Sequence, residues 1–186
     1  IVSCNVALAA SAPKMRTIPR VEQQAWTADA LRVFLRAAAG HRLFPALWLS
    51  ANTGVRRSEL LGLRWSDLDV DHARLSINRG LVAVGYEVHE SRGKTDHSRR
   101  CIDLDPTTLA VLDGPAASGV RRGGHRPTWV VTTASGDPVH PHSISQTFDR
   151  IARRAPVPII RFHELRHTHG SLLIAYGVDA MVVKER

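Results

Sequence analysis

The spacing of apolar residues changes period twice along the chain, and this limits the folds open to it. From residue 27 to residue 63 the apolar positions recur at helical intervals. Between 75 and 104 they alternate with polar residues, as in strands, and beyond 107 the helical interval returns. This order predicts a mainly helical α+β domain with a small antiparallel sheet.

The first 26 residues are expected to form a linker or tail, and residues 27–186 one domain. The early part is rich in Ala, Ser and Pro, a basic stretch follows, and neither part has an apolar period. Thr27 is a suitable N-cap for a first helix that ends at Gly40. A second helix is expected over 43–51, and a third begins near Arg56.

The strand region contains short apolar runs around residues 75–77, 81–84, 88 and 101–104. Residues 91–98 are rich in turn-forming side chains, which predicts a hairpin with Lys94 at its tip. A further strand is expected at 129–131, after a loop over 114–127. Helices are then expected around 144–151, over 163–176 and after Gly177.

The composition excludes several classes of protein. With 186 residues, 44% of them hydrophobic, the chain can bury a core, so disorder throughout is excluded. No apolar run is long enough to span a bilayer. Two cysteines rule out a disulfide scaffold and a cysteine-only zinc site, and so low a number favours the reducing cytoplasm.

The basic excess consists almost entirely of arginine. The formal net charge is +8, and lysine accounts for only three of the 25 basic residues. Arginine binds phosphate through two parallel hydrogen bonds, so a polyanionic partner such as nucleic acid is favoured. A coding bias toward arginine explains the count equally well.

A first polar cluster lies at residues 53–59, Thr-Gly-Val-Arg-Arg-Ser-Glu. Gly54 allows a sharp turn, so Arg56 enters at a helix start, where anions are favoured. Glu59 follows three residues later, at a spacing that holds the guanidinium. The alternative is a capped surface helix with an ordinary ion pair.

A denser cluster lies at residues 161–169, Arg-Phe-His-Glu-Leu-Arg-His-Thr-His. On a helix His163, Arg166 and His167 share a face. A histidine that moves a proton beside an arginine that binds a phosphoryl oxygen is suited to phosphoryl transfer. The alternative for His167 or His169 is a core histidine with satisfied hydrogen bonds.

The same stretch also matches the zinc-protease pattern H-E-x-x-H through His163, Glu164 and His167, with Glu185 as a conceivable third ligand. Arg166 argues against zinc, because it would place a fixed positive charge between two ligands of a dication. A zinc hydrolase therefore stays a remote alternative.

Taken together, these clusters resemble one family. In their order, three segments resemble the catalytic domain of tyrosine recombinases (phage integrases). They are Thr53-Gly-Val-Arg56-Arg-Ser-Glu59-Leu-Leu-Gly-Leu-Arg-Trp65-Ser-Asp67, then Lys94 between strands, then His163-Glu-Leu-Arg166-His167-Thr-His169-Gly. The likeness covers roughly residues 25 to 186. It implies a mostly helical fold with a small antiparallel sheet, clamped on one side of duplex DNA.

The resemblance implies roles for single residues. Arg56 and Arg166 would hold the scissile phosphate, Lys94 would protonate the leaving 5′ oxygen, and His163 would be the general acid/base. The remaining expected positions are Glu59 and His167 in support, and Arg57, Arg99 and Arg100 on DNA. Neither metal nor cofactor is expected. The expected partners are double-stranded DNA and full-length recombinase protomers, in the bacterial cytoplasm at the nucleoid.

The nucleophile of the family is not found at its expected place. The family has a Leu-Gly-His motif and then a tyrosine after a stretch like 182–186, whereas this sequence contains only Tyr86 and Tyr176. Both are interpreted as structural, Tyr86 in a strand and Tyr176 on the apolar side of a helix. The expectation is an incomplete or remnant prophage integrase that cannot cleave DNA alone. The alternative is a non-catalytic DNA-binding remnant or a partner of an intact recombinase.

Overall fold

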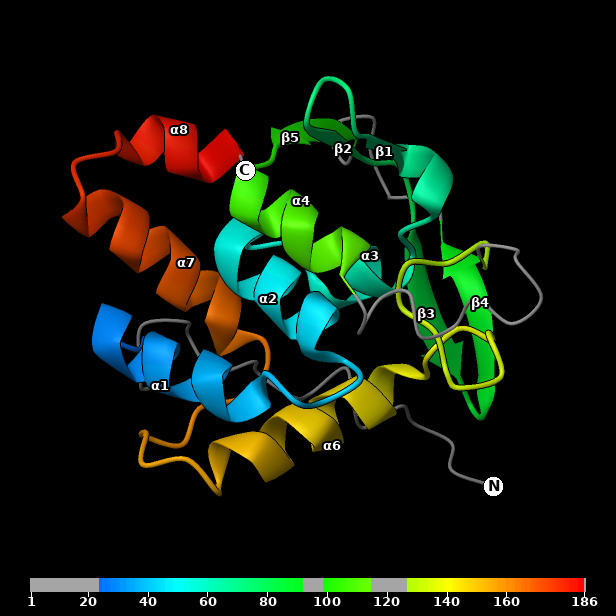
Figure 1. Cartoon of the computed structure of the whole chain (residues 1–186), viewed down its shortest axis with the longest axis horizontal. Coiled ribbons are helices and arrows are strands. Elements are labelled where there is room, and N and C mark those ends of the chain that lie inside the picture. Colours follow the sequence, from blue (N-terminus) through cyan, green and yellow to red (C-terminus); the bar gives the residue numbers. More distant parts are fainter. Residues whose placement is uncertain (1–23, 92–98, 115–126, 186) are drawn as a thin grey trace, which may run out of the picture.

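The computed structural model describes residues 24–91, 99–114 and 127–185, and it confirms a mainly helical domain with small antiparallel sheets. The helices lie on one side of the molecule and the strands on the other (Figure 1). The helices are α1 (Ala28–Ala38), α2 (Phe44–Thr53), α3 (Arg57–Leu61), α4 (Pro106–Asp113), α6 (Pro141–Ala152), α7 (Glu164–Ala175) and α8 (Ala180–Glu185), with a 3-10 turn at Trp65–Asp67. The strands are β1 (Leu68–Asp69), β2 (Arg74–Ile77), β3 (Gly80–Val84), β4 (Glu87–Ser91) and β5 (Arg100–Asp103).

Helix α2 is the centre of the helical part and contacts α1, α3, α4 and α7 (Figure 1). Its sequence is apolar on most sides, which suits a helix surrounded by others. It ends at Gly54, whose φ of 64° reverses the chain in the left-handed region that glycine adopts without strain. The reversal leads directly into α3, and it places Arg56 at the start of that helix.

An aromatic cluster joins α1, α6 and the segments before α1 and α7. The ring centroids of Phe34 and Phe148 lie 4.9 Å apart, and Trp26 lies 5.0 Å from Phe34. Trp26 is 3% exposed and donates a hydrogen bond from its indole to the carbonyl of Pro158 at 2.8 Å. Trp26 falls in the predicted linker, but its packing makes it part of the domain.

The strands are antiparallel, as expected, and those that the structure describes are divided between two small sheets. One sheet has the order β1-β2-β5, and the other pairs β3 with β4. A tight turn at Gly85, with φ of 62°, and Tyr86 joins β3 to β4, because Val84 is in register with Glu87. The hairpin tip is therefore at this turn. The strands on either side of 92–98 belong to different sheets, and Lys94 itself lies outside the described residues.

The predicted strand at 129–131 is reduced to a single bridge between Trp129 and Arg64. The guanidinium carbon of Arg64 lies 4.8 Å from the centroid of the Trp129 ring. Over the parts of the chain that the structure describes, the helices are too short or too polar to cross a membrane.

Candidate active site

The start of α3 is organised by Glu59. Its Oε2 accepts the backbone N–H of Arg56 at 2.9 Å, and its Oε1 accepts a hydrogen bond from the Arg56 guanidinium at 2.7 Å. The first bond caps the helix and the second forms the ion pair that the spacing predicts. The Glu59 side chain is 10% exposed and that of Arg56 is 53% exposed. The carboxylate is therefore buried behind a guanidinium that faces solvent.

Arg100 reaches the same carboxylate from β5. Its Nη1 donates to Glu59 Oε1 at 3.1 Å and its Nη2 to Oε2 at 2.8 Å, so the pair is bidentate. The Arg100 side chain is only 12% exposed. Arg100 was expected on the DNA surface, and the structure corrects this, because its guanidinium is committed to Glu59 inside the protein.

The two arginines keep Glu59 ionised. Burial alone raises the pKa of a carboxyl group, but hydrogen bonds from Arg100 and from the backbone and side chain of Arg56 outweigh it. The pKa of Glu59 falls to about 2 as a result. At neutral pH the carboxylate is a fixed negative charge between two guanidinium groups.

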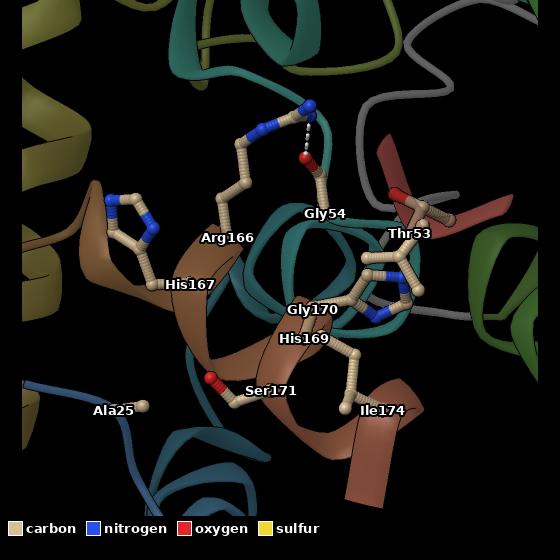
Figure 2. A pocket seen from close by; sticks show the side chains of 10 residues that line it. Ala25, Thr53, Gly54, Arg166, His167, His169, Gly170, Ser171 and Ile174 are labelled. Carbon is tan, nitrogen blue, oxygen red and sulfur yellow. Dashed lines mark hydrogen bonds between the residues drawn. The ribbon is translucent and has the colours of Figure 1, made fainter. Parts of the chain in front are cut away.

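The second arginine of the site, Arg166, comes from α7. Its guanidinium donates a hydrogen bond to the carbonyl oxygen of Gly54, at the end of α2 (Figure 2). Burial lowers the pKa of Arg166, and the positive charges of Arg56 and Arg100 lower it further. The bond to Gly54 places Arg166 beside the start of α3, two residues from Arg56 in the chain.

Gly54 has no room for a side chain on its other side. A Cβ there would lie 2.7 Å from Cδ2 of His169, which packs its ring against this residue (Figure 2). The junction between α2 and α7 is therefore closed by His169 and bonded by Arg166. His169 packs against Gly54 and is itself partly exposed.

His163 and His167 lie on the N-terminal turn of α7. Their ring centroids are 5.3 Å apart and the rings are nearly perpendicular. Partial burial lowers the pKa of His163, and the charges of His167, Arg166, Arg161 and Arg56 lower it further. The lowered pKa favours the neutral form of His163, which can accept a proton.

Glu164 is used in building the start of α7. Its carboxylate accepts the backbone N–H of Arg161 at 2.6 Å and the guanidinium of the same residue at 3.2 Å. The side chain is 8% exposed. In a zinc hydrolase this glutamate would be the general base, but here it caps a helix. Within the described ranges no group of three or more His, Cys, Asp or Glu side chains is placed to bind a metal.

A pocket of about 340 Å³ opens beside Arg166 (Figure 2). Its polar side comes from the α2–α7 junction, and its apolar side from Ile174 and Val183. The remaining lining residues are Ala25, Thr53, Gly54, Arg166, His167, His169, Gly170 and Ser171.

The other predicted residues are placed as follows. Arg57 is exposed, and its guanidinium donates to Ser145 Oγ at 2.9 Å. Arg99 is exposed at the edge of β5. Tyr86 and Tyr176 are 101% and 71% exposed, so neither side chain is packed in the core. Tyr86 lies in a turn, and Tyr176 lies past the last buried turn of α7.

The structural role of Arg100 was missed, although the sequence contains a signal for it. Ile102 is buried, and in a strand alternate residues share a face, so Arg100 points to the same side as this core residue. The bond from Arg166 to the Gly54 carbonyl has no such signal, because a backbone acceptor leaves no trace in the sequence.

Comparisons with known proteins agree on one family. Residues 27–186 match the Phage integrase family. The chain is 28% identical over 182 residues to a "Tyrosine recombinase XerC-like" protein of Caldanaerobacter subterraneus subsp. tengcongensis, covering 88% of this chain and 46% of that protein. It is 26% identical over 150 residues to the integrase of Staphylococcus phage L54a, covering 76% of this chain and 42% of that protein. The chain thus spans less than half the length of these two relatives.

Solved structures show the same fold. The Tn1549 transposon integrase in complex with transposon right end DNA superposes with a TM-score of 0.77 at 19% identity, over 89% of this chain and 58% of that chain. The lambda integrase dimer bound to a COC′ core site superposes with a TM-score of 0.68 at 19% identity, over 98% of this chain and 62% of that chain.

Proposed function

Because the chain belongs to the phage integrase family, we propose that it serves site-specific DNA recombination or integration, and that its arginine cluster binds the DNA phosphodiester that reacts. The substrate is double-stranded DNA. The cluster consists of Arg56 and Arg100, which hold the carboxylate of Glu59, and of Arg166, which bonds to the carbonyl of Gly54 just before Arg56.

The charge balance of this cluster carries the proposal. Arg56 and Arg100 bond to one carboxylate, and Arg166 bonds to a neutral backbone carbonyl, so the three positive charges exceed the one negative charge by two. Arg56 is half exposed and Arg166 is partly buried beside the pocket. A phosphodiester oxygen bound between them would supply the missing negative charge, and it would accept charge-assisted hydrogen bonds.

The histidines and Lys94 complete the proposed chemistry. His163, whose neutral form the lowered pKa favours, takes a proton from the attacking hydroxyl and returns it in the reverse step. Lys94 protonates the 5′ oxygen as it leaves, a role that rests on the family resemblance alone. Arg57 and Arg99 are both exposed, and their proposed role is to contact phosphates of the DNA backbone beside the reacting one.

None of these residues is assigned the role of the nucleophile. In the family a tyrosine forms the covalent phosphotyrosine, but Tyr86 and Tyr176 both lie on the surface, outside the arginine cluster. We therefore assign to these 186 residues the binding and activation of the phosphate. DNA binding without cleavage, alone or beside an intact recombinase protomer, is the second candidate function, and the same arginine cluster favours it.

Binding to a labelled duplex, measured by fluorescence anisotropy at two salt concentrations, tests the proposal. Arg56→Ala should weaken binding about tenfold, since a charge-assisted bond to phosphate is lost. Arg32→Ala is the matched control, because Arg32 forms the same type of ion pair with Asp29 on the exposed face of α1. Equal losses in both variants would show general basicity and no phosphate site.

A nicked suicide duplex tests the assignment of the chemistry. The 186-residue chain should bind it and leave no covalent protein–DNA band on a denaturing gel. A covalent band would show that one of its own side chains attacks the phosphate.

A further inference from the structure

Arg56 alone cannot fix its own orientation. Its side chain is long, 53% exposed and anchored by one ion pair to Glu59. A partly exposed pair of this kind holds a guanidinium loosely, and the one further bond that Arg56 itself gives the carboxylate comes from its backbone N–H. Whatever fixes the plane of the Glu59 carboxylate therefore fixes the direction of Arg56.

Arg100 fixes that plane. Its two bonds to Glu59, at 3.1 and 2.8 Å, engage both carboxylate oxygens at once. Each oxygen then has one bond to Arg100 and one to Arg56, through the Arg56 guanidinium on Oε1 and its backbone N–H on Oε2. A carboxylate held by four such bonds has no rotational freedom left.

The support comes from a separate part of the fold. Arg100 pairs with Ile77 across the β2–β5 ladder, and the side chain is 12% exposed. Glu59 and Arg56 belong to the start of α3, and Glu59 lies 41 residues earlier in the chain than Arg100. The sheet thus braces the helix at the point where the proposed phosphate ligand begins.

We infer that Arg100 is a positioning residue of the phosphate site, which orients Arg56 by locking the carboxylate of Glu59. The inference rests on the proposed function, since it assigns Arg100 a part in phosphate binding without contact to the phosphate. The planar fork of arginine is required for this role, because a lysine ammonium carries the same charge without bidentate geometry.

Inorganic phosphate, titrated at constant ionic strength, provides the test. Its binding is followed by NMR through the Nε–H signals of Arg56 and Arg166. Arg100→Lys keeps the positive charge and loses the fork, and it should weaken phosphate binding about tenfold. Arg100→Gln loses the charge as well and should weaken it further. Arg74→Lys and Arg74→Gln are the matched controls, because Arg74 forms an exposed ion pair with Asp103 in the same sheet.

The Arg100 variants distinguish an orienting role of Arg100 from a contribution of its charge alone. If Arg100→Lys binds phosphate as the wild type does while Arg100→Gln is weakened, Arg100 contributes charge only, and the inference is overturned. Equal binding by all variants overturns it too, with the phosphate site left standing. If phosphate shifts neither arginine signal in the wild type, the proposed function fails and the inference falls with it.

If the Arg100 variants do not fold, a measurement on the wild type still tests the inference. Carbon-13 NMR of labelled glutamate reports the ionisation of Glu59 directly. The lock requires this carboxylate to titrate near its value of about 2. Titration in the ordinary glutamate range would show that Arg100 does not hold it, and would overturn the inference.

Discussion

The guanidinium of Arg166 donates a hydrogen bond to the carbonyl oxygen of Gly54, 112 residues away in the chain. Gly54 is the C-cap of α2 and lies two residues before Arg56. One backbone carbonyl therefore places the two proposed phosphate ligands relative to each other. His169 packs against the same glycine, so the position is held by both a bond and a contact.

Replacing Gly54 by alanine should destabilise the fold by roughly 2–4 kcal/mol. The left-handed conformation costs an L-residue about 1 kcal/mol, and overpacking against His169 adds about 1–3 kcal/mol. Urea unfolding measures the change. Gly85→Ala is the matched control, because its φ of 62° is similar and no atom lies within 4 Å of the added Cβ. Equal losses in the two variants would mean that the His169 ring moves aside at no cost.

Stability should fall in acid through the titration of Glu59. Its pKa is lowered in the folded protein from 4.5 to about 2, so the stabilisation is complete above 4.5 and is lost as the pH falls toward 2. Its magnitude is roughly 3 kcal/mol, from the size of that shift. In urea unfolding, Glu59→Gln should be less stable than the wild type at neutral pH, and the difference should shrink in acid.

Asp103→Asn is the control for this titration. It removes an exposed carboxylate paired with Arg74 in the same sheet, and it should leave the acid limb of the stability curve unchanged. A gap between wild type and Glu59→Gln that stays constant from neutral pH to acid would contradict the prediction.

His163 should titrate below 6.5, its ordinary pKa. Partial burial lowers the pKa first, and the neighbouring charge of His167 is the next cause. His167→Ala should therefore raise the pKa of His163, as followed by NMR of the ring protons. His142→Ala, at an exposed position of α6, is the control and should leave the pKa of His163 unchanged. A wild-type His163 that titrates above 6.5 would rule out the neutral base.

Removing Trp26 should cost about 3–5 kcal/mol, as is usual for a buried aromatic residue replaced by alanine. Its ring packs against Phe34 and Phe148, and its indole N–H is bonded to Pro158. Thermal unfolding of Trp26→Ala measures the loss. Tyr86→Ala is the exposed aromatic control and should change stability by less than about 0.5 kcal/mol. A small loss of stability in Trp26→Ala would mean that Trp26 belongs to the linker and not to the folded domain.

The helices were predictable because their signal is local. Helix α6 repeats buried residues at helical spacing through Ile144, Phe148 and Ile151, and α1 does the same through Leu31 and Phe34. The pair of Arg56 with Glu59 was predictable for the same reason, since both residues lie within one helical turn. Trp26 carries no such signal, because a single aromatic residue has no period.

The long-range parts of the site were not predictable from spacing. Alternation marks β5 as a strand, but nothing in it says that β5 pairs with β2 while its neighbour in sequence, β4, pairs with β3. Arg100 was placed on DNA for its charge, and its commitment to Glu59 depends on that pairing. The burial of a guanidinium is decided by the partner that the fold brings to it.

The division of the strands into two sheets also affects how this region can evolve. In a hairpin, the length of the loop is tied to the register of its two strands. Here the described strands pair β4 with β3 and β5 with β2, and no described pairing joins β4 to β5 across the segment that carries Lys94. Insertions or deletions within 92–98 leave both registers intact. The bonds of Arg100 to Glu59 would therefore stay in place while the length of the segment that carries Lys94 changes.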